Sequence, residues 1–157
     1  MCDQHKFVFE FDKAFNHQLI EKFEASPAHT LSEDLAPPQT GVYALYWKGR
    51  LVYAGKALKT TLKGRLADHA RKIRRRQRIE LQEVTCRFLE IEGSWFVRAA
   101  EDALITHYSP AWNLSGFGGH DPGSGRPGIR PCKWDQDFPL RPDYLGPKRV
   151  RRLPPKR

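Results

Sequence analysis

Two tyrosines with nine residues between them, Tyr43 and Tyr53, are the first side chains of this chain whose types and spacing suggest chemistry. They belong to two short glycine-containing phrases, Gly41-Val42-Tyr43 and Tyr53-Ala54-Gly55-Lys56. A phenol has a pKa of about 10 and can act as a general base where its surroundings favour the phenolate. On these residues alone, aromatic packing across a hairpin is the simpler explanation of the pair.

An arginine and a histidine four residues apart, Arg65 and His69, form a second candidate pair. On a helix over residues 60–77 the apolar side chains form one stripe, made of Leu62, Leu66 and Ile73. His69 falls within this stripe and Arg65 lies roughly 40° beyond it, at 100° per residue. The pair combines a cation with a proton-transfer group. A structural core histidine and an Arg65–Asp68 surface ion pair remain the alternatives.

A carboxylate on an apolar helix face is the third candidate. In a helix over residues 94–108 the apolar stripe is formed by Val97, Leu104 and Tyr108. Glu101 falls inside the stripe, whereas Asp102 points outward. A carboxylate in such a place must be paired, protonated or bound to a metal. Both a metal site and an ion pair with Arg98 or Arg65 explain it, and Asn113, just past the helix, would by itself be a turn residue or cap.

The elements that must position these residues follow from the hydrophobic pattern. Residues 41–47 and 50–54 predict two strands, and Lys48-Gly49 predicts a tight turn between them. Outside this hairpin the pattern predicts strands over 7–11 and 84–91, and helices over 12–25, 60–77 and 94–108, the last capped by Ser94. Proline-containing stretches at 26–27 and 36–38 indicate a linker into the hairpin.

Charge and composition narrow the class of partner. The chain of 157 residues carries a net charge of +9, but residues 71–78 and 148–157 contain twelve basic residues and no acid. The remainder therefore has a net charge of −3. Two basic patches on a mildly acidic body favour a nucleic acid over a small acidic metabolite, with anionic lipid as the weaker interpretation.

The cysteine count and the apolar runs predict the compartment. Cys2, Cys86 and Cys132 are odd in number and widely spaced, which favours reduced thiols in the cytoplasm. No apolar run resembles a membrane span or a signal peptide, so we expect no membrane association. A zinc site built from Cys132 and His120 is a further, weaker alternative, because no Cys-x-x-Cys pair exists.

Taken together, the tyrosine phrases, Arg65, Glu101 and Asn113 resemble the GIY-YIG nuclease superfamily. His69, four residues after the arginine, and the tract from Trp112 to Gly123 followed by Arg126 and Trp134-Asp135 resemble its type II restriction endonuclease branch. The resemblance covers roughly residues 40–141. Val42 and Ala54 replace isoleucines of the usual phrases, and the gap between the tyrosines is slightly short.

The resemblance implies an α+β fold with a central antiparallel three-stranded sheet flanked by helices. It also implies hydrolysis of a DNA phosphodiester with one Mg²⁺ or Mn²⁺ per active site. Glu101 would hold the metal, and Arg65 would face the phosphate oxygens. Tyr43 would be the general base, biased toward phenolate by His69, Lys56 or Arg65, and Tyr53 would orient the water or the phosphate. Asn113 would position the glutamate helix, and Gly55 would let the DNA backbone approach.

Specificity must come from elements built into a chain this short. We expect an N-terminal arm over 1–39, a nuclease core over 40–115, and DNA-recognition loops and a basic tail over 116–157, all in one compact domain. The expected DNA-binding residues are Arg71, Arg74, Arg75, Arg76, Arg78, His120, Arg126, Arg130, Lys133 and Arg141. A homodimer on a palindromic double-stranded site is expected, with a cognate DNA methyltransferase as a partner.

Two rival functions stay open from the sequence. A structure-specific nicking nuclease of repair or defence would use the same chemistry on branched DNA. A non-catalytic DNA-binding module is the other, although such a module has no need of a glutamate on an apolar helix face.

Overall fold

The computed structural model describes residues 10–118 and 132–144, and the elements named below lie in these two ranges. Four strands form one antiparallel sheet in the order β1-β4-β2-β3. The strands are β1 (His29–Thr30), β2 (Gly41–Trp47), β3 (Arg50–Ala57) and β4 (Val84–Glu90). The helices are α1 (Phe11–Ala25), α2 (Leu62–Arg74), α3 (Ser94–Tyr108) and α4 (Lys133–Asp137), with short 3₁₀ turns η2 (Leu81–Glu83), η3 (Ala111–Leu114) and η4 (Pro142–Tyr144).

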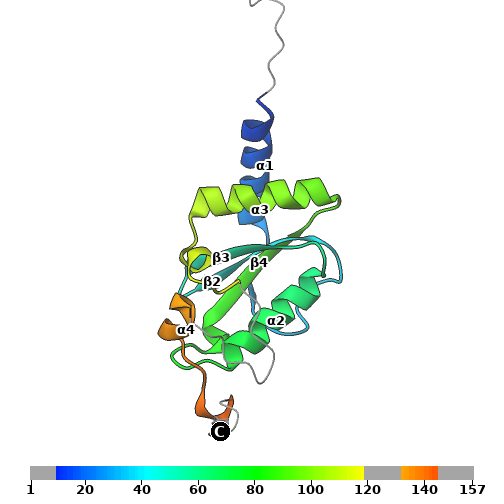
Figure 1. Cartoon of the computed structure of the whole chain (residues 1–157). Coiled ribbons are helices and arrows are strands. Elements are labelled where there is room, and N and C mark those ends of the chain that lie inside the picture. The colour runs from blue at the N-terminus through cyan, green and yellow to red at the C-terminus, as the bar shows by residue number, and fades with distance from the viewer. Residues whose placement is uncertain (1–9, 119–131, 145–157) are drawn as a thin grey trace, which may run out of the picture.

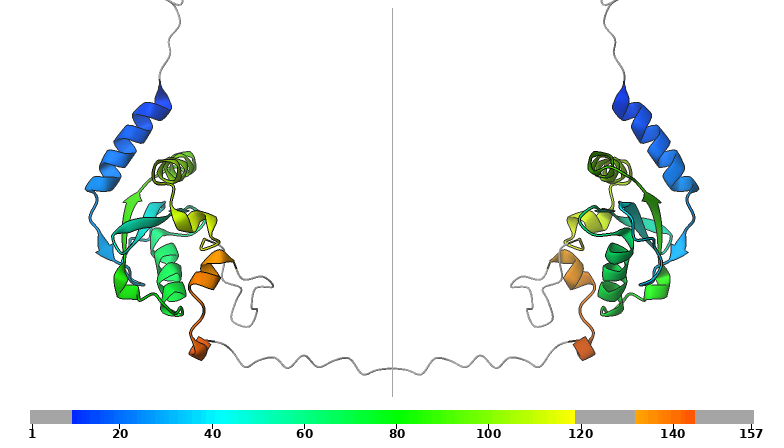
Figure 2. Two further views of the ribbon diagram at one scale, coloured as in Figure 1. Left: turned by 90° about the vertical axis from the view of Figure 1, so that its left-hand side faces the viewer. Right: turned by 90° about the vertical axis from the view of Figure 1, so that its right-hand side faces the viewer.

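Helices cover both faces of the sheet. Figure 1 shows α3 above the sheet and α2 below it. Figure 2 shows α1 alongside α3. The core is accordingly divided in two. Helices α1 and α3 pack through Phe23 and Val97 against Val42 and Ala54 of the hairpin. Helix α2 and the segment around Trp134 pack on the opposite face. The predicted α+β class is therefore confirmed.

The hairpin between β2 and β3 forms as predicted. Lys48 and Gly49 both have positive φ angles, 51° and 76°, which match the two-residue turn that fits the twist of antiparallel strands. An irregularity follows in the register, because Leu45 pairs with Tyr53 while Tyr46 pairs with Leu51. Val52 is thus the extra residue of a β-bulge.

Helix α2 begins at a conventional N-cap, where the Thr61 hydroxyl accepts a hydrogen bond from the Gly64 amide at 3.1 Å. Helix α3 begins differently from the prediction. Ser94 is its first residue rather than its cap, and Gly93 takes the cap position with φ of 88° and no side-chain hydrogen bond. Helix α2 ends at Arg74, short of the predicted residue 77.

The sheet also differs from the prediction in the number of its strands. Four strands are present where three were expected, because β1 adds two residues that pair with Cys86 and Thr85 of β4. Phe11, expected at the end of a strand, is the first residue of helix α1, and Glu10 is its N-cap; residues 7–9 of that expected strand lie outside the described residues. Cys86 and Cys132 are free thiols, as predicted, and Cys2 lies outside the described ranges.

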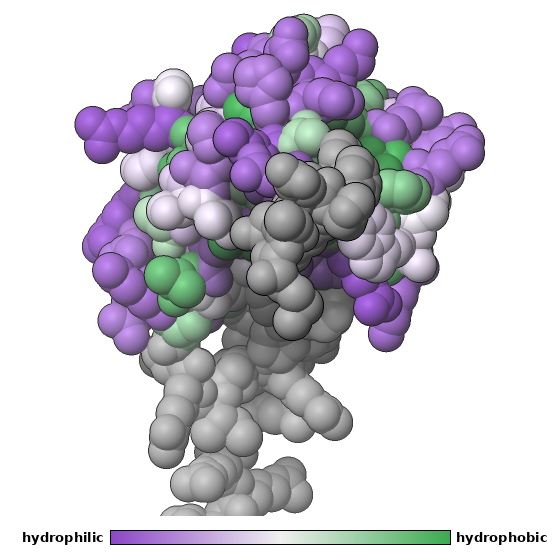
Figure 3. Space-filling view, turned by 90° about the horizontal axis from the view of Figure 1, so that it is seen from above, coloured by the Kyte–Doolittle hydropathy of each residue, from purple (hydrophilic) through white to green (hydrophobic). Residues whose placement is uncertain are grey.

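The outer face above α3 is largely hydrophilic, with small groups of hydrophobic side chains between the polar ones (Figure 3). Trp95 and Phe96 at the start of α3 are exposed, and the Trp95 ring lies 5.4 Å from that of Phe11. In residues 10–118 and 132–144, no helix combines the length and the apolar character needed to cross a membrane.

Candidate active site

The β-bulge brings Tyr43 and Tyr53 to the same face of the sheet. Tyr43 lies opposite Gly55, and Tyr53 lies opposite Leu45. Without the extra Val52 residue, Tyr43 would face Ala54 and the two phenols would point to opposite faces. Their ring centroids are 6.1 Å apart on the side covered by α2. The slightly short gap between the tyrosines is therefore compatible with a shared site.

Gly55 makes room for Tyr43. A Cβ atom at Gly55 would lie 2.7 Å from the Tyr43 hydroxyl and 2.9 Å from the Tyr53 ring. The glycine is buried beneath the two phenols. The structure thus corrects the expectation that Gly55 opens a path for the DNA backbone, because the space that it leaves is filled by the tyrosines.

Helix α2 contributes Arg65 and His69 to the same cluster. The Nε2 atom of His69 lies 2.8 Å from the Tyr43 hydroxyl, and the histidine is only 4% exposed. Its ring centroid lies 5.3 Å from that of Tyr53. Arg65 is half-buried, and in the part of the chain that the structure describes its Nε atom is buried without a hydrogen-bond partner. An unpaired guanidinium N–H beside two phenols suits an anionic oxygen of a ligand.

The surroundings keep both members of the Tyr43–His69 pair neutral. Burial lowers the pKa of His69 well below its ordinary value, and the charges of Arg65 and Lys72 lower it further. Burial raises the pKa of Tyr43 above its usual range, with Tyr53 acting in the same direction and Arg65 against it. A neutral imidazole has one nitrogen that accepts a hydrogen bond, so Nε2 can take the one that the Tyr43 hydroxyl donates. His69 can therefore act on Tyr43 as a neutral hydrogen-bond acceptor rather than as a positive charge.

Glu101 and Lys56 form an ion pair on the opposite face of β3. Lys56 follows Gly55, so its side chain points toward α3, where its Nζ contacts Oε2 of Glu101. The side chains are 37% and 16% exposed. The ion pair that we gave as one alternative for Glu101 is therefore present, but its partner is Lys56 rather than Arg98 or Arg65. We had expected Lys56 to act on Tyr43. Instead, its ammonium pairs with Glu101 on the opposite face of β3.

The two faces meet at the edge strand β3. Burial is the main cause that raises the pKa of Tyr53, and the Glu101 carboxylate contributes to the rise, while Arg65 and Tyr43 act in the opposite direction. Tyr53 thus responds electrostatically both to the arginine on one face and to the carboxylate on the other. Because β3 ends the sheet, side chains from both faces can approach one ligand at this edge.

Asn113 binds the backbone of β3 between Tyr53 and Gly55. Its Oδ1 accepts a hydrogen bond from the Ala54 amide at 2.9 Å, and its Nδ2 donates one to the Ala54 carbonyl at 2.8 Å. We had expected Asn113 to position the glutamate helix. In the structure it instead hydrogen-bonds the strand that carries Tyr53.

The donor set near Glu101 fits a divalent cation that keeps most of its water. Among the described residues, no three His, Cys, Asp or Glu side chains gather where they could hold a metal together. Mg²⁺ is commonly bound by one or two carboxylates together with water and phosphate oxygens, so Glu101 alone is sufficient on the protein side. The alternative zinc site loses support, because the Cys132 thiol hydrogen-bonds the Asp135 carboxylate, while His120 lies outside the described residues.

The predicted DNA-binding residues are divided between surface and interior. Arg71 pairs with Asp68 and Glu33, and Arg74 pairs with Glu33 as well. Arg75 is exposed, and its guanidinium lies 5.6 Å from the Tyr144 ring. Arg78 and Lys133 are exposed too.

Arg76 and Arg141, also among the expected DNA contacts, have protein partners as well. Arg76 is buried and lies 2.8 Å from the Asp135 carboxylate, so its inclusion among the DNA-binding residues was wrong. Arg141 donates to both carboxylate oxygens of Glu80, at 2.8 and 2.9 Å. His120, Arg126 and Arg130 lie outside the described residues.

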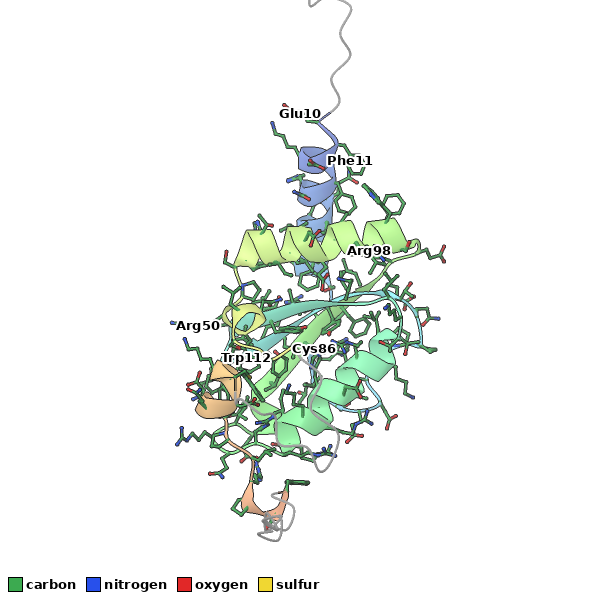
Figure 4. All side chains as sticks on the ribbon, viewed as in Figure 1. Glu10, Phe11, Arg50, Cys86, Arg98 and Trp112 are labelled. Atoms are coloured by element: carbon green, nitrogen blue, oxygen red, sulfur yellow. The ribbon has the colours of Figure 1, made fainter. Side chains whose placement is uncertain are left out.

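Sequence reasoning did not single out Lys72 or Phe117, which pack against the tyrosine–histidine cluster. Phe117 is fully buried, with its ring centroid 4.8 Å from that of His69. The ring centroid of Trp112, which lies in η3 and is labelled in Figure 4, is 4.9 Å from that of Phe117. The available sequence signal for a buried ring was an apolar residue between two glycines, Gly116 and Gly118.

Comparisons with known proteins give one family and a set of structural relatives. The family model described as "Eco29kI GIY-YIG domain" matches residues 53–144. No curated protein sequence matches the chain. The magnesium-bound GIY-YIG N-terminal endonuclease domain of UvrC from Thermotoga maritima is 23% identical, with a TM-score of 0.41, over 62% of this chain and 97% of that one. A point mutant of the same domain, bound to its catalytic divalent cation, is 23% identical with a TM-score of 0.40, over 60% of this chain and 93% of that one.

Proposed function

Because the chain belongs to the Eco29kI GIY-YIG family, a family of type II restriction endonucleases, we propose that it hydrolyses DNA phosphodiesters at a specific double-stranded site. One observation carries the proposal. Two phenols, a neutral imidazole and a guanidinium whose Nε–H has no partner among the described residues converge at the edge strand whose other face is next to Glu101. This arrangement supports the assignment of a proton acceptor and a phosphate ligand to one face of that strand and of a metal ligand to the other.

In the proposed reaction, the Tyr43–His69 pair removes the proton of the attacking water. Burial disfavours a free Tyr43 phenolate, so the tyrosine needs an acceptor for its own proton. Neutral His69, 2.8 Å away, is that acceptor when its proton is on Nδ1. The water gives its proton to the Tyr43 oxygen as the Tyr43 proton moves to Nε2 of His69, which leaves an imidazolium and no free phenolate.

Arg65 and Tyr53 bind the scissile phosphate in this proposal. The unpaired Nε–H of Arg65 donates to a non-bridging oxygen, and a fixed planar fork suits the growing negative charge. Tyr53, the less buried of the two phenols at 7% exposed, orients the water or the phosphate. A divalent cation held by Glu101, Mg²⁺ or Mn²⁺, would stabilise further charge on the phosphoryl group. When a cation competes for Glu101, Lys56 must release Oε2.

We also propose that the enzyme acts as a homodimer on a palindromic site, protected in its host by a methyltransferase of the same specificity. The reason is the match between the two-fold symmetry of such a site and that of a dimer. Exposed Arg75, Arg78 and Lys133 are the described candidates for DNA contacts. Light scattering of the free protein and mass photometry of the DNA complex should report a dimer, and a monomer in both would exclude this part of the proposal.

Digestion of DNA of known sequence, followed by mapping of the ends, tests the activity and the specificity together. Purified chain with Mg²⁺ or Mn²⁺ should cut at one fixed palindrome. Glu101→Gln should lower the rate at least about 10²-fold. Asp102→Asn, which removes the exposed neighbouring carboxylate, should leave the rate unchanged and is the matched control.

Three outcomes would contradict the proposed function. Absence of cleavage with both metals, or a Glu101→Gln variant as active as the native chain, would overturn the proposed chemistry. A preference for branched DNA over any fixed sequence would identify the structure-specific nicking nuclease instead.

A further inference from the structure

Phe117 packs against His69 and Tyr53, beside the Tyr43–His69 pair. Its ring stacks on the His69 ring at 4.8 Å with an interplanar angle of 19°, and it meets the Tyr53 ring edge-on at 4.9 Å. Phe117 is 0% exposed although it lies between two exposed glycines. A ring in this position separates the imidazole from solvent over one whole face.

Lys72 holds Phe117 in place from the helix that carries His69. One turn after His69, its Nζ donates a hydrogen bond to the Phe117 carbonyl at 2.9 Å. The same ammonium lies 5.3 Å from the centroids of the Phe117 and Trp134 rings. Lys72 is itself buried, so its charge acts on His69 through protein rather than through water. The segment at Phe117 and helix α2 are thus joined beside the imidazole.

We propose that Phe117 and Lys72 are positioning residues of the active site, which act through His69 by keeping it a neutral proton acceptor for Tyr43. Phe117 does so by excluding water from the ring, and Lys72 by fixing Phe117 and placing a positive charge near the imidazole. The catalytic role of these two residues rests on the proposed function. The physical content of the inference, the protonation state of His69, can be measured without DNA.

Within residues 10–118 and 132–144, the groups that face His69 all favour the neutral ring or leave it unchanged. Tyr43 from β2 and Tyr53 from β3 are protonated phenols, whose pKa values are raised mainly by burial. Among the described residues, Arg65 and Lys72 from α2 are the charges that act on the imidazole, and both oppose a further positive charge. Phe117 adds no charge. Protonation of His69 removes its acceptor nitrogen, so activity should fall as the pH drops through the His69 pKa.

The experiment measures the His69 pKa by NMR titration of the imidazole signals in the full chain. The chain has six histidines, and a His69→Gln spectrum identifies the signal. Phe117→Ala and Lys72→Met are the test variants, the second of which leaves no large cavity. Phe138→Ala is the control, because Phe138 is buried in the same aromatic cluster but packs on Trp112 and Trp134.

We expect both test variants to raise the His69 pKa by about one unit, toward its ordinary value, and Phe138→Ala to leave it unchanged. The acid limb of the pH–rate profile for cleavage should move to higher pH by the same amount in the two test variants. An unchanged His69 pKa in folded Lys72→Met and Phe117→Ala would overturn the inference. An equal shift in the Phe138→Ala control would overturn it as well, because a general loosening of the cluster would then explain the effect. The titration needs neither DNA nor metal, so its result does not depend on whether the chain cuts DNA.

Discussion

Replacing Gly55 with alanine should inactivate the nuclease by displacing Tyr43 from His69. The new methyl group would lie 2.7 Å from the Tyr43 hydroxyl and 2.9 Å from both the Tyr43 Cζ atom and the Tyr53 Cε1 atom. These contacts are closer than a Cβ atom tolerates, and the strand that carries Gly55 is held by its pairing with β2 and by Asn113. The phenols must therefore move, and the 2.8 Å contact with Nε2 is the first to be lost.

The effect on stability should be modest compared with the effect on catalysis. Overpacking a core costs about 1–3 kcal/mol, and replacing glycine by alanine returns ~0.4–1 kcal/mol through the unfolded state. A net loss of ~0.5–2 kcal/mol corresponds to a decrease in Tm of about 1–8 °C in a chain of this length. Loss of a positioned general base lowers the rate by about 10²–10⁴-fold.

Single-turnover cleavage and thermal unfolding, measured on the same preparation, check this prediction. Gly64→Ala is the control, since it adds the same methyl group in α2 at an ordinary contact of 3.4 Å from Thr61 Oγ1. This control should be active and slightly more stable, because alanine favours a helix over glycine by ~1 kcal/mol. A folded Gly55→Ala protein that cuts as fast as the native chain would refute the assignment of Tyr43 and His69 as the proton acceptors.

Three other substitutions test separate contacts. Asn113→Asp keeps the acceptor for the Ala54 amide but loses the donor to its carbonyl, so the free energy of unfolding in urea should fall by about 1–3 kcal/mol. Lys56→Met removes a cation that competes for Glu101, so the free protein should bind Mg²⁺ about two- to fivefold more tightly in calorimetric titration, and an unchanged affinity would contradict the pairing. Asp135→Asn removes the carboxylate 2.8 Å from the buried Arg76 guanidinium, so the free energy of unfolding in urea should fall by about 3 kcal/mol. An unchanged free energy of unfolding would show that this ion pair does not stabilise the fold.

Local patterns were sufficient to predict most of the fold. Lys48 and Gly49 adopt the positive φ angles that the turn prediction requires. The apolar stripe on α2 correctly placed His69 inside, where it is 4% exposed. Strand β1 was missed because two residues cannot show an alternating pattern, and it exists only through its pairing with β4.

The contacts that define the candidate site depend on information that is not local. The sequence identified Tyr43 and Tyr53, but only the bulge at Val52 decides that they share a face. The ion pair between Lys56 and Glu101 joins residues 45 positions apart, and either residue alone has several possible partners.

Arg76 shows the same limit in a charged run. In the sequence it belongs to the basic patch over 71–78, but in the structure its guanidinium is buried against Asp135 and lies 4.8 Å from the Trp134 ring centroid. Nothing in the charge pattern distinguishes it from Arg75, its exposed neighbour. The burial is decided by the segment that returns near residue 134 and packs on α2.

The hold of Asn113 on Ala54 also has a consequence for self-association. Strand β3 is the open edge of the sheet, and the outward N–H and C=O at its middle would otherwise be a template for another strand. The Asn113 amide group fills this template as a neighbouring strand would, with one donor and one acceptor. A second copy of the chain therefore cannot extend the sheet by pairing with Ala54 at this edge.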